Sequence, residues 1–277
     1  MYGAILGDIS GEPYEFVRSP KKKEFPLFSQ KPRFTDDTVM TVAICDAILK
    51  AGTTADENTM KTAMITSMQL WGHKYPHAGY GRKFYTWLAM ENTRPYNSWG
   101  NGSAMRVSSV GWLFDTLERT REVARWSAEV THNHPEGVKG AEAVASVIWL
   151  ARNGGVDGGT QGTSGELKSQ IRAFVTREFG YDLSRTCDQI RPNYRHVESC
   201  QQTVPEAITA FLEGESFEDV IRTAVSLGGD CDTLTDIAAA MAEAFYGLPP
   251  EFKTRCLDYT TPDMHAVLSE FDKQRSA

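Results

Sequence analysis

The sequence predicts an all-α protein, because apolar residues recur at helical spacing along most of the chain and the alternation typical of β-strands is nearly absent. The 277 residues, 41% of them hydrophobic, suffice for a sizeable core. The glycine-rich stretch from Gly154 to Gly165 has helical pattern on both sides, so we interpret it as a flexible surface connection. We therefore expect one domain over residues 1–277.

The clearest helix begins near Thr38 and ends before Gly52, with Asp36 and Asp37 ahead of it. Pro205 suits the first position of a helix, and the stretch from Ser216 to Asp219 forms a variant capping box. Residues 7–15 mix turn formers with three acids and are expected to form a loop. Further helices are expected at about 58–71, 105–118, 120–131, 136–152, 205–213, 217–227 and 233–246.

Composition and charge exclude several classes of protein. No apolar run approaches the ~20 residues of a membrane span, and the N-terminal residues do not form a secretion signal. The net charge of −7 opposes direct nucleic-acid binding. Five cysteines without a C-x-x-C pair argue against a disulfide framework or a cysteine zinc site. We expect a cytoplasmic monomer, with the basic run Lys21 to Lys23 in a solvated loop.

Two acidic clusters, TDDT at residues 35–38 and DCDT at residues 230–233, each stand where a helix begins. Carboxylates stabilise helix N-termini, so either cluster alone could be a helix cap. A cap needs only one carboxylate, however, and adjacent aspartates repel. Four aspartates with flanking hydroxyls form an oxygen-only ligand set suited to Mg²⁺ or Mn²⁺. If the two helix starts converge, the set suffices for two ions with one bridging aspartate.

Two further motifs carry weaker signals. The turn from Gly100 to Arg106 opens a helix and could present backbone N–H groups to a phosphate. His132 and His134 have a spacing that could bind zinc, but no third histidine or cysteine lies nearby in the sequence. Contact with a ligand, or capping of the next helix, is the favoured interpretation of these histidines.

Together these motifs resemble the ADP-ribosylglycohydrolase family. The resemblance rests on GDISGEPYE, TDDT, GNGSAMR, TH before a helix, and LGGDCDT before an alanine-rich helix ending AFYG, and it covers about residues 3 to 250. It implies a compact orthogonal helical bundle with two Mg²⁺ or Mn²⁺ ions in a central cleft. The implied reaction is hydrolysis of the α-linkage between the distal ribose of ADP-ribose and an acceptor, which is a protein side chain or a small conjugate.

The resemblance also implies roles for individual residues. The metal ligands would be Thr35, Asp36, Asp37, Asp230, Asp232 and Thr233, with Asp232 as the bridge, and Cys231 should point away from the ions. Ser98, Gly100, Asn101 and Gly102 match the loop that holds the diphosphate and adenosine, Trp99 is placed to stack on adenine, and His132 matches a substrate-contacting histidine.

Glu15 corresponds to a family glutamate on a mobile flap, and Asp8 is expected to brace that loop. Ions on the 2- and 3-hydroxyls of the ribose would hold the ring while water attacks C1. Either Glu15 or Asp36 would move the proton, and the sequence does not rank these two.

Two alternatives remain open at this stage. A non-catalytic ADP-ribose-binding or crystallin-like protein of the same fold would have lost metal ligands, whereas all six are present. An isoprenoid synthase-like diphosphate enzyme would carry its aspartates inside helices with a third acid one turn onward, but Val39, Met40 and Thr41 follow TDDT. The identity of the acceptor stays open.

Overall fold

The computed structural model describes residues 1–16, 19–155 and 163–276, and its regular secondary structure in these ranges is helical, which confirms the all-α prediction. The longer helices are α1 (Tyr2–Gly11), α2 (Asp36–Ala51), α3 (Glu57–Lys74), α7 (Leu117–Glu129), α8 (Pro135–Asn153), α9 (Ser164–Phe179), α11 (Cys200–Glu213), α12 (Phe217–Leu227), α13 (Cys231–Tyr246), α14 (Pro250–Tyr259) and α15 (Pro262–Ser276). The shorter ones are η1 (Glu12–Tyr14), α4 (Arg82–Leu88), α5 (Gly102–Met105), α6 (Val110–Leu113) and α10 (Cys187–Ile190).

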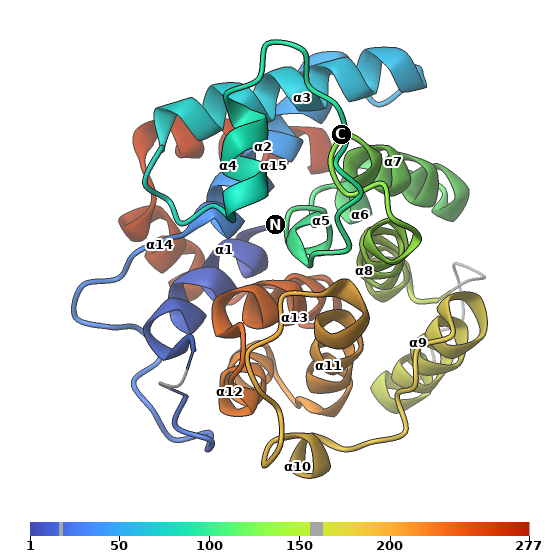
Figure 1. Cartoon of the computed structure of the whole chain (residues 1–277). Coiled ribbons are helices and arrows are strands. Elements are labelled where there is room, and N and C mark those ends of the chain that lie inside the picture. Colours follow the sequence, from blue (N-terminus) through green and yellow to red (C-terminus); the bar gives the residue numbers. More distant parts are fainter. Residues whose placement is uncertain (17–18, 156–162, 277) are drawn as a thin grey trace.

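Helix α13 lies at the centre of the bundle, with α11 and α12 on one side and α1 beside it (Figure 1). Glycines at every fourth position of α1 face α13: a Cβ on Gly3, Gly7 or Gly11 would collide with backbone atoms of α13. The two helix backbones therefore pack in direct contact. This contact fixes α1, including Asp8, next to the start of α13.

The prediction of a loop at residues 7–15 is wrong for its first half, because α1 continues to Gly11. All ten residues of α1 are buried, so it has no polar face to produce a helical hydrophobic pattern. Its glycines serve close helix packing and not a turn. The short η1 helix and Glu15 follow directly.

Two other expectations need correction. The helix expected at residues 105–118 is broken into α5 and α6, because Ser108 and Ser109, which favour turns over helix interiors, lie between them. Pro205 is not the first residue of its helix but lies inside α11, which begins five residues earlier, at Cys200. The lost hydrogen bond falls on the carbonyl of Gln201, an exposed residue.

The other helix predictions hold within a few residues, including α2, α12 and α13. Ser216 accepts a hydrogen bond from the backbone N–H of Asp219, as the predicted cap requires. Most of the predicted connection from Gly154 to Gly165 lies outside the described residues. The five cysteines are buried and free of disulfides. No helix in the described ranges is long and apolar enough to cross a bilayer.

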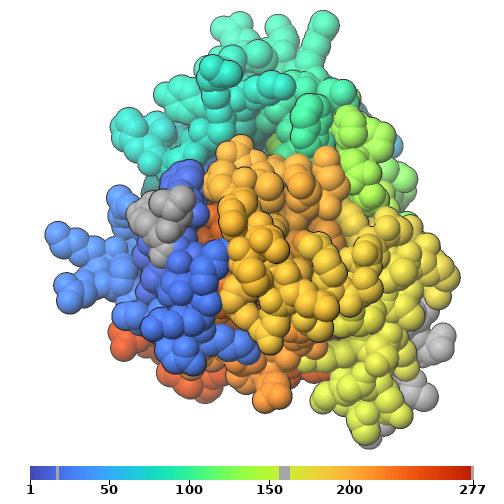
Figure 2. Space-filling model, turned by 60° about the horizontal axis from the view of Figure 1, so that its bottom comes forward, coloured from blue at the N-terminus to red at the C-terminus, as the bar shows by residue number. Residues whose placement is uncertain are grey.

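The basic run from Lys21 to Lys23 is not a solvated loop as a whole. The Lys21 ammonium donates to the backbone carbonyl oxygens of Arg191, Tyr194 and Leu227, and Lys23 pairs with a carboxylate of α12. These bonds join the N-terminal segment to the chain around residue 195. Figure 2 shows the two segments side by side, in blue and gold.

Candidate active site

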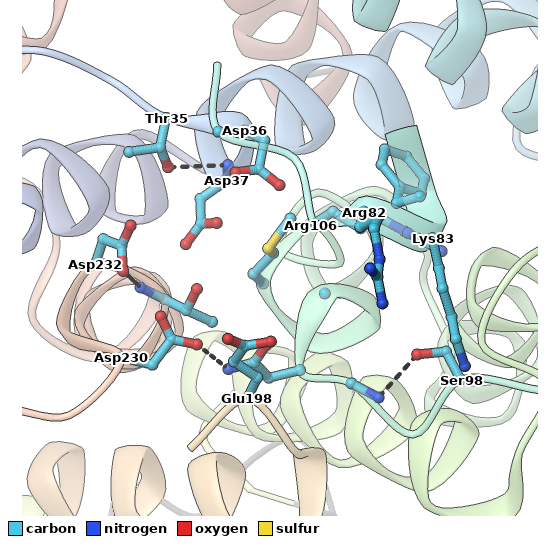
Figure 3. A pocket seen from close by; sticks show the side chains of 18 of the residues that line it. Thr35, Asp36, Asp37, Arg82, Lys83, Ser98, Arg106, Glu198, Asp230 and Asp232 are labelled. Atoms are coloured by element: carbon cyan, nitrogen blue, oxygen red, sulfur yellow. Dashed lines mark hydrogen bonds between the residues drawn. The ribbon is translucent and has the colours of Figure 1, made fainter. Parts of the chain in front are cut away.

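A pocket of about 540 Å³ opens where α2, α5 and α13 begin. The sequence-predicted site residues that line it are Glu15, Thr35, Asp36, Asp37, Ser98, Gly100, Asn101, Gly102, His132, Asp230, Asp232 and Thr233. The one predicted residue absent from this lining is Trp99. The fold therefore brings together two aspartate clusters that lie nearly 200 residues apart in the chain (Figure 3).

Asp8, a residue of α1, holds the TDDT cluster in place through hydrogen bonds. The hydroxyl of Thr35 caps α2 by accepting from the Asp37 N–H at 3.2 Å. Asp8 accepts from the N–H and hydroxyl groups of both Thr35 and Thr38, at 2.5 to 3.1 Å. Asp8 is thus a brace, as expected, but it braces the TDDT turn and not its own segment. With the Thr35 proton donated to Asp8, the remaining lone pair of the hydroxyl can face the pocket.

The second cluster is held by the start of α13. Asp232 accepts from the Thr233 N–H at 2.9 Å, and Asp230 accepts from the Asn101 amide at 2.6 Å. The Asn101 amide also donates to Thr203. The side-chain N–H groups of Asn101 therefore position a carboxylate and are not available to substrate. Cys231 directs its thiol toward the Val225 carbonyl, away from the pocket, as expected.

The aspartates crowd one another in a buried space. Burial, followed by the charge of Asp232, raises the pKa of Asp36, Asp37 and Asp230 well above the usual value, and burial also raises the pKa of Asp232. The same two causes raise the pKa of Asp8 to about 7. Four neighbouring carboxylates can all stay ionised only if positive charge is supplied between them.

Divalent cations fit this set of residues. The Asp37 Oδ2 atom is buried and has no hydrogen-bond partner in the described part of the chain. Such an atom is expected where a carboxylate oxygen binds a cation. The side chains of Asp230 and Asp232 lie within hydrogen-bonding reach of each other. The donors Thr35, Asp36, Asp37, Asp230, Asp232 and Thr233 all offer oxygen, which suits Mg²⁺ or Mn²⁺.

Glu15 reaches the same end of the pocket from a different kind of element. It follows η1 and precedes Phe16, whose φ of 59° is unfavourable for a bulky side chain. Phe16 forms an isolated β-bridge with Gly229, immediately before Asp230. Glu15 is therefore held by loop contacts and not by a helix start.

His132 is set as a hydrogen-bond donor by its neighbours. The buried Arg106 donates to the Thr131 hydroxyl at 2.8 Å, which leaves the proton of that hydroxyl available to His132 Nδ1, 2.7 Å away. The Nε2 atom then carries the ring proton. Burial, helped by Arg106, lowers the pKa of His132 well below its usual value, so the ring is neutral. His132 Nε2 lies beside Gly100 and Gly102 and presents an N–H to the pocket.

The glycine turn uses part of its hydrogen-bonding capacity internally. The Gly100 N–H donates to the Ser98 hydroxyl at 3.1 Å, and the Asn101 N–H donates to the Glu198 carbonyl at 2.9 Å. A Cβ at Gly102 would lie 3.3 Å from His132 Nε2. The glycines therefore leave room beside His132, but two of the backbone amides are not free for a phosphate.

Trp99 is half exposed, at 50%, and its ring forms a T-shaped contact with His134. Its predicted contact with adenine stays a prediction. His134 caps α8 by accepting from the Glu136 N–H, which confirms one of the two interpretations offered for these histidines.

Sequence reasoning missed several residues of the pocket. Arg82 and Lys83, at the start of α4, extend into it in the direction of Ser98 (Figure 3). His196 and Glu198 also line the pocket. A GYGRK stretch with two glycines was a usable signal for the first pair, whereas a lone histidine in an irregular segment carried none.

An all-helical fold with a pocket that is acidic at one end and basic at the other fits a glycosidic hydrolase acting on a phosphorylated sugar. The family profile described as ADP-ribosylglycohydrolase matches residues 1–276. The chain belongs to the ADP-ribosylglycohydrolase family, which is a family of glycosidic hydrolases.

Individual relatives agree with this assignment. The chain is 26% identical to ADP-ribosylhydrolase ARH3 of Homo sapiens, over 95% of this chain and 90% of that protein. It is also 26% identical to ADP-ribosylarginine hydrolase Tri1 of Pseudomonas putida, over 91% of this chain and 71% of that protein. A solved structure titled ADP-ribosylglycohydrolase-related protein complex has a TM-score of 0.71 at 20% identity, covering 99% of this chain and 95% of that one.

Proposed function

We propose that the protein hydrolyses the α-glycosidic bond between the distal ribose of ADP-ribose and an acceptor, with two divalent cations, Mg²⁺ or Mn²⁺, between TDDT and DCDT. The observation that carries the proposal is the meeting of both aspartate clusters at one end of a pocket whose other end holds Ser98, Arg82 and Lys83. The acceptor is a protein side chain or a small conjugate, in line with the names of the relatives.

Residues at different positions along the pocket have different roles in the proposed reaction. Cations bound between the clusters would hold the ribose hydroxyls and lower the pKa of a water. Glu15 and Asp36 face that end, and one of them accepts the proton of the attacking water or passes one to the leaving acceptor. His132 donates its Nε2–H to the substrate near the glycine turn.

Arg82 and Lys83 supply the positive charge for the diphosphate. Because two amides of the glycine turn are satisfied internally, the turn alone neutralises little of that charge. The side chains of Arg82 and Lys83 extend toward Ser98, at the end of the pocket away from the aspartates (Figure 3). They therefore orient ADP-ribose with its distal ribose at the acidic end.

Removing both charges, as Arg82→Gln with Lys83→Gln, is predicted to raise the Kd for ADP-ribose about tenfold or more, since charge-assisted hydrogen bonds contribute about 1.5 to 3 kcal/mol. Adenosine, which has no phosphate, should bind with unchanged affinity. Calorimetry at two salt concentrations measures both, and Lys31→Gln removes an exposed charge elsewhere as the control. Equal losses for adenosine and ADP-ribose would show that the pair does not contact the diphosphate.

The experiment that tests the proposed function is product analysis with a panel of defined substrates. Arginine-linked, serine-linked and other O-linked ADP-ribosyl peptides are incubated with the protein and Mg²⁺ or Mn²⁺, and released ADP-ribose is measured by mass spectrometry. At least one substrate should release free ADP-ribose, and EDTA should stop the release. Binding of ADP-ribose without hydrolysis of any conjugate would favour the non-catalytic alternative, and full activity after exhaustive chelation would exclude the metal-dependent mechanism.

A further inference from the structure

A histidine, His196, lies among the acids on the side of the pocket that Glu15 lines. One ring nitrogen of His196 and one carboxylate oxygen each of Glu15 and Asp230 lie within 4.8 Å of one another. The three atoms come from three different parts of the chain: Glu15 follows η1, Asp230 immediately precedes α13, and His196 lies in the segment before α11. Three potential ligand atoms thus converge from three separate parts of the chain, and one of them is nitrogen.

The protonation of His196 suits a metal ligand. Its Nε2 atom lies 3.1 Å from a carboxylate oxygen of Glu198, which can only accept, so Nε2 carries the proton. The Nδ1 atom is buried and has no hydrogen-bond partner among the described residues. In metal sites a histidine ligand commonly donates its second nitrogen to a carboxylate in this way, which orients the ring and makes the free nitrogen more basic.

The surroundings hold the His196 segment in place. The His196 ring packs on Phe16, with ring centroids 4.9 Å apart, and Phe16 bridges to Gly229 beside Asp230. The Lys21 ammonium binds the carbonyl oxygens of Tyr194 and Leu227, which joins this segment to the end of α12. The Asn101 N–H bonds the Glu198 carbonyl from the other side. The ring is therefore positioned before any ion binds.

We propose that His196 is an additional metal ligand, which with Asp230 and beside the proton-carrying Glu15 forms a mixed nitrogen and oxygen site for a transition-metal ion such as Zn²⁺ or Mn²⁺, and that Glu198 orients its ring. The inference adds a ligand to the cation centre of the proposed function and rests on that centre for Asp230. Oxygen ligands alone favour Mg²⁺ and Mn²⁺, whereas an imidazole raises the affinity for Zn²⁺ far more than the affinity for Mg²⁺. His196 therefore shifts metal preference away from Mg²⁺.

Metal binding by the full chain tests this directly, without an activity assay. Chelated protein is titrated with Zn²⁺ and, separately, with Mg²⁺ by calorimetry, and the Mn²⁺-loaded protein is examined by pulsed electron paramagnetic resonance for coupling to an imidazole nitrogen. His196→Gln should lower Zn²⁺ affinity about tenfold or more, change Mg²⁺ affinity less than about threefold, and abolish the nitrogen coupling. Glu198→Gln should give a smaller loss of Zn²⁺ affinity. His73→Gln, at an exposed position on α3, serves as the control.

Zn²⁺ affinity within twofold of wild type in His196→Gln, or the absence of nitrogen coupling in the wild-type protein, would overturn the inference. Circular dichroism of each variant establishes that it is folded, and His196 lies in an irregular segment with a partly exposed side chain. The two proposals fail separately: if Asp232→Asn abolishes Mg²⁺ binding while His196→Gln keeps the wild-type Zn²⁺ affinity, the cation centre stands and His196 lies outside it.

Discussion

Replacing Asp232 by asparagine is expected to lower ADP-ribosyl hydrolysis by roughly three orders of magnitude while the protein stays folded. Asp232 is buried, and its charge acts on Asp36 and Asp37 of the other cluster as well as on Asp230, as expected of a bridging ligand. Removing it takes away metal affinity but also relieves repulsion, so folding stability should not fall. Single-turnover rates, metal calorimetry and thermal unfolding measure the three effects.

Asp236→Asn is the matched control, because Asp236 lies one turn further along α13. It is equally buried, and neither of its carboxylate oxygens has a hydrogen-bond partner among the described residues. It is not part of the pocket lining, so its variant should retain metal binding and turnover. If Asp232→Asn kept more than a tenth of wild-type turnover with metal bound, the bridging role would be wrong.

The second large effect is expected at Glu15. Glu15→Gln should lower kcat by about a hundredfold or more, the usual contribution of a general acid or base. Mg²⁺ and ADP-ribose should bind with affinities within about threefold of wild type. The aspartates proposed to hold the cations lie at helix starts, whereas Glu15 lies in a loop. Steady-state kinetics and calorimetry with Mg²⁺ separate the two quantities.

Glu12→Gln provides the comparison for Glu15, since Glu12 is a nearby acid in η1 that pairs with Arg33 and does not line the pocket. Its turnover should match wild type. Loss of Mg²⁺ binding in Glu15→Gln would show that Glu15 is a structural ligand, and the assignment of a catalytic flap would then be withdrawn.

The parts of the site that could be predicted from sequence are those with a local physical signature. TDDT and DCDT combine surplus carboxylates with helix starts, and both are where the pattern placed them. The same holds for the glycine turn and His132, although the sequence could not show that the Asn101 amide braces Asp230. That contact depends on how α5 meets α13, which is a tertiary property.

Other features had a weak local signal or none. Helix α1 was missed because a helix buried on every side shows no amphipathic pattern, and its glycines resemble turn residues until α13 is placed against them. His196 lies in an irregular segment, and its chemistry arises only where that segment meets Glu15 and Asp230. Arg82 and Lys83 could be any surface pair until the pocket is assembled around them.

The most direct test of the two-cation centre is a crystal of the protein with Mn²⁺ and ADP-ribose, measured for anomalous scattering from manganese. Two Mn²⁺ peaks are expected about 3.5 to 4 Å apart between the side chains of TDDT and DCDT, with the distal ribose beside them. A protein that hydrolyses its substrate fully while showing no manganese peak between Asp36 and Asp232 would contradict it.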